Sequence, residues 1–135
     1  MHDTKICVVV RDDLETWQKL NVTAFLAAGV AVSTPDSIGE QYEDGSGNLY
    51  LPIFAQPVFV FAASAEHLQR TRARALSREV PIAIYTKDMF ATSNDNDNRA
   101  VVRAVVSENL DIVGLAFRAE RKTFDKIVSG LKLHA

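Results

Sequence analysis

Lys5-Ile6-Cys7-Val8-Val9-Val10-Arg11-Asp12-Asp13-Leu14 is the stretch of this chain that decides the fold. Residues 6–10 are apolar without interruption, and such a run is typical of a strand covered on both faces. Three later runs, at 58–62, 82–85 and 112–117, predict further core strands. Helical patterns separate them, and strands that alternate with helices predict an α/β protein built as a three-layer α/β/α sandwich.

The helices are predicted from capping residues and apolar spacing. Beyond Asn21 the first helix carries apolar residues on most of its circumference, which predicts burial nearly all round. The Asp44-Gly45-Ser46-Gly47-Asn48 segment predicts a turn inside a small hairpin or an ordered loop. The predicted helices span 16–31 with Thr16 as cap, 64–78 with Ser64 as cap, 99–108 after a run of Asn and Asp, and 120–129.

Length and composition indicate one globular domain over residues 1–135. Hydrophobic residues make up 47% and charged residues 24%, which is ordinary for a soluble protein. A formal net charge of -2 argues against a chain built as a whole to hold a polyanion. No apolar run reaches the roughly 20 residues of a membrane span, and no signal peptide is apparent, so a cytoplasmic location is expected. Cys7 is the only cysteine, which excludes an internal disulfide and favours a buried apolar role.

The two ends of the chain resemble the type II peptidyl-tRNA hydrolases. The opening block quoted above and the closing pairs Val113-Gly114 and Asp125-Lys126, followed by Leu131-Lys132-Leu133, carry the resemblance. It implies a peptidyl-tRNA hydrolase II-like fold around a mixed four- to five-stranded sheet. It also implies an Asp and a Thr four residues apart after the third strand, a spacing that Asp88 and Thr92 keep.

The catalytic Lys, Gln and His that those enzymes carry on the first helix are missing. Their positions fall on Leu20, Ala24 and Ala27. Ester hydrolysis needs polar or charged groups near the carbonyl and the attacking water, so the parent reaction is not expected. Lys19 lies next to the lysine position, but one residue turns a helical side chain by about 100°. Lys19 could therefore reach the same pocket only in a shifted register.

The chain is more similar to an uncharacterised, mostly bacterial family, domain of unknown function number two thousand. Its blocks span nearly the whole sequence, and the family implies the hydrolase-like fold without an established activity. The blocks are Trp17-Gln18-Lys19-Leu20-Asn21-Val22, Ala24-Phe25-Leu26-Ala27, Gly39-Glu40, Tyr42, Gln56-Pro57, Ala83-Ile84-Tyr85-Thr86, Phe90-Ala91-Thr92, Asn98-Arg99-Ala100 and the ending Leu131–His134.

Two sets of candidate site residues follow. Lys19, Asp88 and Thr92 are the candidate catalytic set of a rearranged pocket. Asn21, Asp95 and Asn98 are the candidate ligand-binding set. Each has a structural alternative: Asn21 could hold the 39–48 loop to the helix, and the Asn and Asp residues of 94–98 could simply cap a helix.

The sequence predicts neither a metal site nor a cofactor. Counted from Asp95 as the start of a calcium loop, Ala100 replaces the required Gly and Val106 the required Glu. Arg70, Arg74 and Arg78 are four residues apart and could hold an RNA backbone, although such a row is more often the solvated face of an amphipathic helix.

Three hypotheses are therefore kept. The first is a module on a hydrolase-like scaffold that binds a small-molecule ligand or a macromolecule. The second is a hydrolase or transferase, acting on peptidyl-tRNA or a related ester, that uses Lys19, Asp88 and Thr92. The third is a structural or interaction protein that forms a homodimer.

Overall fold

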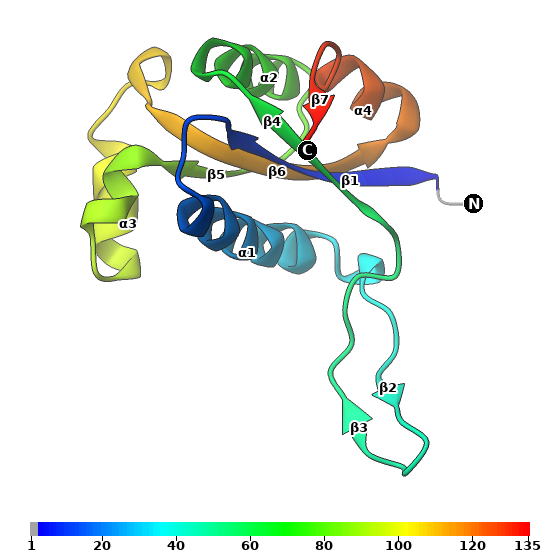
Figure 1. Cartoon of the computed structure of the whole chain (residues 1–135). Helices are drawn as coiled ribbons and strands as arrows, with labels where there is room; N and C mark the ends of the chain where they lie inside the picture. Colours follow the sequence, from blue (N-terminus) through cyan, green and yellow to red (C-terminus); the bar gives the residue numbers. More distant parts are fainter. Residues whose placement is uncertain (1–2) are drawn as a thin grey trace.

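The computed structural model describes residues 3–135 and contains a five-stranded mixed sheet (Figure 1). Its strand order is β5-β6-β1-β4-β7, and β1 pairs in parallel with β4 and antiparallel with β6. The α/β class and the central position of the opening strand are therefore confirmed. The strands are β1 (Thr4–Arg11), β4 (Val58–Ala63), β5 (Ala83–Thr86), β6 (Ile112–Glu120) and β7 (Lys132–Leu133).

Helices cover both faces of this sheet, as Figure 1 shows. One face carries α1 (Thr16–Ser33), and the other carries α2 (Ala65–Ser77) and α4 (Arg121–Ile127). A short helix, α3 (Asp95–Arg103), lies beside the end of β5 and packs on the 3-10 turn η2 (Lys87–Ala91). Two further 3-10 turns, η1 (Pro35–Ser37) and η3 (Ser107–Asn109), complete the connections.

The apolar run of β1 supplies both cores. Cys7 and Val9 pack in the cluster that includes Leu68 of α2 and Phe124 of α4. Ile6, Val8 and Val10 pack in a second cluster, on the side of α1, with Val22, Leu26 and Val30. Alternate residues of a strand point to opposite faces, so a run without polar positions is what two covered faces require.

The α1 helix corrects the prediction of nearly complete burial. Only one ridge is buried, namely Val22, Leu26 and Val30. Trp17, Leu20, Phe25 and Val32 are large apolar side chains with exposed fractions of 57 to 80%. Phe90 and Tyr85 contact Trp17 and Phe25, and the rest of the side that faces away from the sheet is largely uncovered within residues 3–135. Its N-cap is Glu15 rather than Thr16, and the Glu15 N–H donates to the Gln18 side chain at 3.0 Å.

The predicted hairpin is confirmed and projects from the body. Its strands are β2 (Tyr42–Glu43) and β3 (Leu49–Tyr50), and we call residues 39–54 the arm. The arm is closed at its root by a bridge between Ile38 and Phe54. Figure 1 shows it leaving the α1 side of the sheet beyond the end of that helix.

The start of α3 corrects a second prediction. The helix was expected over 99–108 but spans Asp95–Arg103, because the Asn and Asp run forms its first turn instead of preceding it. Asn94 is the N-cap, and its side-chain oxygen accepts the Asp97 N–H at 2.8 Å. Acidic residues in a first turn are favoured by the helix dipole.

Two further predictions concern the helices. Ser64 caps α2 as predicted. No helix within residues 3–135 is both long and apolar enough to cross a membrane.

Candidate functional site

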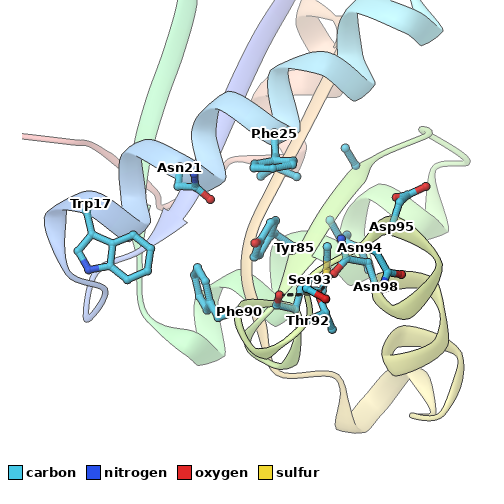
Figure 2. A pocket seen from close by; sticks show the side chains of 14 residues that line it. Trp17, Asn21, Phe25, Tyr85, Phe90, Thr92, Ser93, Asn94, Asp95 and Asn98 are labelled. Atoms are coloured by element: carbon cyan, nitrogen blue, oxygen red, sulfur yellow. Dashed lines mark hydrogen bonds between the residues drawn. The ribbon is translucent and has the colours of Figure 1, made fainter.

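A pocket of about 530 Å³ opens between α1, β5, η2 and the start of α3 (Figure 2). Aromatic side chains line one part of it and amide, hydroxyl and carboxylate groups another. The lining residues are Trp17, Asn21, Phe25, Leu26, Ala83, Ile84, Tyr85, Met89, Phe90, Thr92, Ser93, Asn94, Asp95 and Asn98.

Four aromatic rings form a continuous chain across the pocket. Trp17 contacts Phe90 at 6.0 Å between ring centroids, Phe90 contacts Tyr85 at 5.1 Å, and Tyr85 contacts Phe25 at 5.9 Å. These are tilted and edge-on contacts, the geometries that aromatic pairs prefer. The Trp17 indole N–H also donates to the Glu15 carboxylate at 2.8 Å, which fixes the outermost ring. This row of four rings therefore joins α1, η2 and β5 into one preformed wall of the pocket.

The polar side of the pocket comes from η2 and the first turn of α3. Most of these groups already have partners in the protein. The Thr92 hydroxyl hydrogen-bonds Asn98 Oδ1 and lies 2.9 Å from the Met89 carbonyl oxygen, so it joins η2 to α3. Asp95 forms an ion pair with Arg99. These contacts show that the side facing the aromatic wall is held in place by its own hydrogen bonds.

Three polar groups of the pocket have no such partner. The Asn21 amide, the Tyr85 hydroxyl and the Ser93 hydroxyl make no side-chain hydrogen bond to any of residues 3–135. Burial raises the pKa of Tyr85 above its ordinary value, so at neutral pH its hydroxyl is a neutral donor and acceptor. Figure 2 shows Asn21 on α1 between Trp17 and Phe25. The alternative in which Asn21 holds the 39–48 loop is wrong, because that loop extends away from the helix.

The structure brings together four of the six predicted site residues. Asn21, Thr92, Asp95 and Asn98 all line the pocket. Asp88 is exposed on η2 and does not line it. Lys19 also lies outside it.

Lys19 is turned toward the end of the chain. Its Nζ donates to His134 Nε2 at 3.1 Å, and the His134 backbone N–H donates to the Val60 carbonyl oxygen at 2.8 Å. Lys19 and Asp88 are therefore not assembled with Thr92 around one cavity.

The aromatic wall is the part of the site that the sequence did not predict. Phe25 was expected to be buried with the rest of the helix beyond Asn21, and Trp17, Tyr85 and Phe90 were not considered for a site. A usable signal was present in α1, where aromatic residues lie four positions on either side of the polar Asn21 and so share one ridge with it.

The other candidates have structural roles or no site at all. Arg74 Nη1 donates to the Ser129 carbonyl oxygen at 2.8 Å, so one member of the arginine row binds the end of α4. Burial raises the pKa of the Cys7 thiol, as expected for an inert core cysteine. Within residues 3–135, no three His, Cys, Asp or Glu side chains are grouped so that they could hold a metal ion.

Comparison with known proteins gives a family of unknown function. The chain is similar to a solved structure of a protein of unknown function from Agrobacterium tumefaciens strain C58, with 48% identity, a TM-score of 0.98 and full coverage of both chains. No curated protein matches significantly. The profile of the family described as "Protein of unknown function (DUF2000)" matches residues 4–135. The chain therefore belongs to the DUF2000 family.

Proposed function

We propose that the pocket between α1, β5, η2 and α3 binds a small, flat organic molecule with a hydrogen-bonding edge. The observation that carries the proposal is that two of the unpartnered groups, the Asn21 amide and the Tyr85 hydroxyl, lie beside a row of four contacting aromatic rings. The volume of the pocket, about 530 Å³, falls within the roughly 300–1,000 Å³ of small-molecule pockets.

The chemistry of the wall narrows the class of ligand. Aromatic faces favour a planar ring, which stacks or packs edge-on against them. An amide both donates and accepts, so Asn21 pairs best with a ligand that carries a donor and an acceptor side by side. A planar ring with an amide or lactam edge meets both requirements.

Binding is proposed ahead of catalysis because of where the candidate catalytic residues lie. Lys19 and Asp88 do not line the pocket, and Thr92 is occupied by its contacts with Asn98 and Met89. A neutral Tyr85 is suited to hydrogen bonding rather than to taking a proton.

The single tryptophan provides a direct test. Trp17 lies in the wall and is 57% exposed, so its fluorescence reports on this pocket. We would titrate the protein with benzamide, nicotinamide and the five nucleobases, using cyclohexanecarboxamide as the non-planar comparison. We expect saturable changes with planar amides or lactams and much weaker changes with the non-planar amide.

Three variants sharpen the result. Asn21→Ala should raise the Kd roughly tenfold, since one hydrogen bond contributes about 0.5–1.5 kcal/mol. Tyr85→Phe keeps the ring and removes the hydroxyl, so it should cost a similar factor. Asn109→Ala, on an exposed turn away from the pocket, should leave binding unchanged. No saturable response to any probe, or equal Kd values in Asn21→Ala and the unchanged protein, would refute the proposal.

The hydrolase alternative has its own experiment. We propose the peptidyl-tRNA hydrolase II-like scaffold on the strength of the sequence resemblance at the two chain ends. Hydrolysis of a defined peptidyl-tRNA, lost in Lys19→Ala, would move an enzymatic function ahead of ligand binding. If the folded protein shows no turnover, the proposed similarity to those enzymes is limited to the fold.

A further inference from the structure

The exposed large apolar side chains of residues 3–135 are concentrated on two surfaces. Four lie on α1 and five on the arm, while only Leu76, Val106 and Leu133 lie elsewhere. Large contiguous apolar surfaces on a soluble protein mark interaction sites. The nine are Trp17, Leu20, Phe25 and Val32 of α1 and Tyr42, Leu49, Tyr50, Leu51 and Ile53 of the arm.

On α1 the exposed apolar surface forms two neighbouring ridges. Trp17, Asn21 and Phe25 form the ridge that lines the pocket. The second ridge, which we call the outer ridge, consists of residues four apart that are all exposed and do not line the pocket: Leu20, Ala24, Ala28 and Val32. Only one of the 18 residues of α1 is charged, Lys19, although the solvent side of a surface helix normally carries the charges.

The arm is a preorganised hairpin. The Asp44 carboxylate accepts the Tyr50 hydroxyl at 2.7 Å and the backbone N–H groups of Ser46 and Asn48 at 2.9 and 3.0 Å. At its root, the Gly39 N–H donates to the Ile53 carbonyl oxygen at 2.9 Å. A surface that is already ordered loses less conformational entropy on binding than a flexible segment does.

Within one chain, the arm does not lie over the outer ridge of α1. Figure 1 shows the arm extending away from its own α1, on the side toward which the outer face of that helix looks. The helix and the arm therefore bound an open corner. A second body of the same chain can occupy this corner and present its own arm and outer ridge in return.

We propose that the occupant is a second copy of this chain, with the arm of each protomer lying along the outer ridge of its partner's α1 around a twofold axis. Such an interface is self-complementary, so each contact between arm and helix occurs twice. Without Trp17 and Phe25, which line the pocket, the other seven side chains expose roughly 900 Å² per chain, against roughly 800 Å² per partner in a standard interface. The arm carries Glu40, Glu43 and Asp44 without a basic residue and the outer ridge carries no charge, so the contact brings no like charges together.

The first measurement is the mass of the full chain in solution, by sedimentation velocity or light scattering from about 1 to 100 μM. The proposal predicts twice the 14.9 kDa of one chain at the upper concentrations. It also predicts a Tm that rises with protein concentration, because dissociation is coupled to unfolding. A monomer at every concentration would overturn the proposal, and the ligand titration with Trp17 would be unaffected by that result.

Two charged variants place the contact. Ala24→Lys on the outer ridge and Leu51→Glu on the arm each put a charge into the apolar contact, and each should weaken dimerisation roughly 100-fold or more. Both positions are exposed in the chain, Leu51 by 81%, so folding should be unaffected and circular dichroism would confirm it. Leu76→Glu, an exposed apolar position on α2, is the matched control and should leave the dimer intact.

Mixing the two variants distinguishes arm-on-helix packing from helix-on-helix packing. In the mixed dimer one contact joins the unaltered arm to the unaltered ridge, and the other brings Glu and Lys together. Dimerisation should therefore recover in the mixture although each variant alone is a monomer. No recovery would overturn the arm-on-helix arrangement, as would a dimer that survives either single substitution.

Discussion

The α1 and α2 helices lie on opposite faces of one sheet and differ on the side that faces away from it. Inside they are alike, with the buried ridges Val22, Leu26 and Val30 on α1 and Leu68, Thr71 and Ala75 on α2. Outside, α2 carries charged residues, whereas α1 carries aromatic and aliphatic side chains. The inner sides are set by the shared sheet, so they teach nothing about function. The outer side of α1 is what packing within one chain leaves unexplained.

The largest expected effect tests whether the buried ridges of α1 and α2 contribute equally to stability. Leu26→Ala on α1 and Leu68→Ala on α2 remove side chains that are 3% and 0% exposed, and each should lower the free energy of unfolding by about 2–5 kcal/mol. Urea unfolding at low protein concentration measures both. Val32→Ala, at an 80% exposed position of the same helix, is the control and should cost less than about 0.5 kcal/mol. A cost below about 1 kcal/mol for Leu26→Ala would mean that α1 is only loosely docked.

An intermediate effect tests how closely α1 approaches the sheet. A Cβ added at Gly114 of β6 would lie 2.6 Å from Val22 Cγ1 and 3.0 Å from Leu26 Cδ1. Gly114→Ala should therefore lower the free energy of unfolding by about 1–3 kcal/mol through overpacking. Gly45→Ala in the arm, where nothing lies within 4 Å, should change it little.

A second substitution identifies the cause. Val22→Ala removes the atom that the new Cβ would meet first, so the double variant should be more stable than the sum of the two single costs predicts. Strictly additive costs would show that the overlap with Val22 is not what makes Gly114→Ala destabilising.

The sequence predicts the sheet well because its signal is local. An uninterrupted apolar run such as Ile6–Val10 has few alternatives to a strand covered on both faces. The start of α3 was missed because Asn and Asp serve equally as caps and as first-turn residues, so the run 94–98 does not itself show that Asn94 is the cap.

The burial of α1 could not be predicted for a different reason. An apolar helix has the same composition whether its own fold covers it or another molecule does. The same limit applies to the site. Asn21, Thr92, Asp95 and Asn98 were found from residue type, whereas the direction of Lys19 depends on His134, 115 residues away in sequence.

The smallest expected effect concerns the hydrogen bonds of Asp44, which make the arm an ordered hairpin rather than a flexible loop. Hydrogen bonds from the Tyr50 hydroxyl and then from the Asn48 and Ser46 N–H groups lower the pKa of Asp44 from 3.8 to about 2. A lowered pKa means that the stabilisation is complete above about pH 4 and is lost as the pH falls toward 2. The Ser46 and Asn48 amide resonances should therefore move with an apparent pKa near 2.

The partner group gives an independent check at the other end of the pH scale. The same hydrogen bond raises the pKa of Tyr50, because deprotonation would remove the proton that Asp44 accepts. In Asp44→Asn the acid transition at the two amides should disappear, and Tyr50 should titrate at a lower pH than in the unchanged protein. The free energy of global unfolding should be unchanged, since residues 42–50 at the tip of the arm lie outside both cores. Amide resonances that titrate near pH 4, together with an unchanged Tyr50, would mean that the tip is open in solution. The arm would then lose the preorganisation on which its contact with a second chain depends.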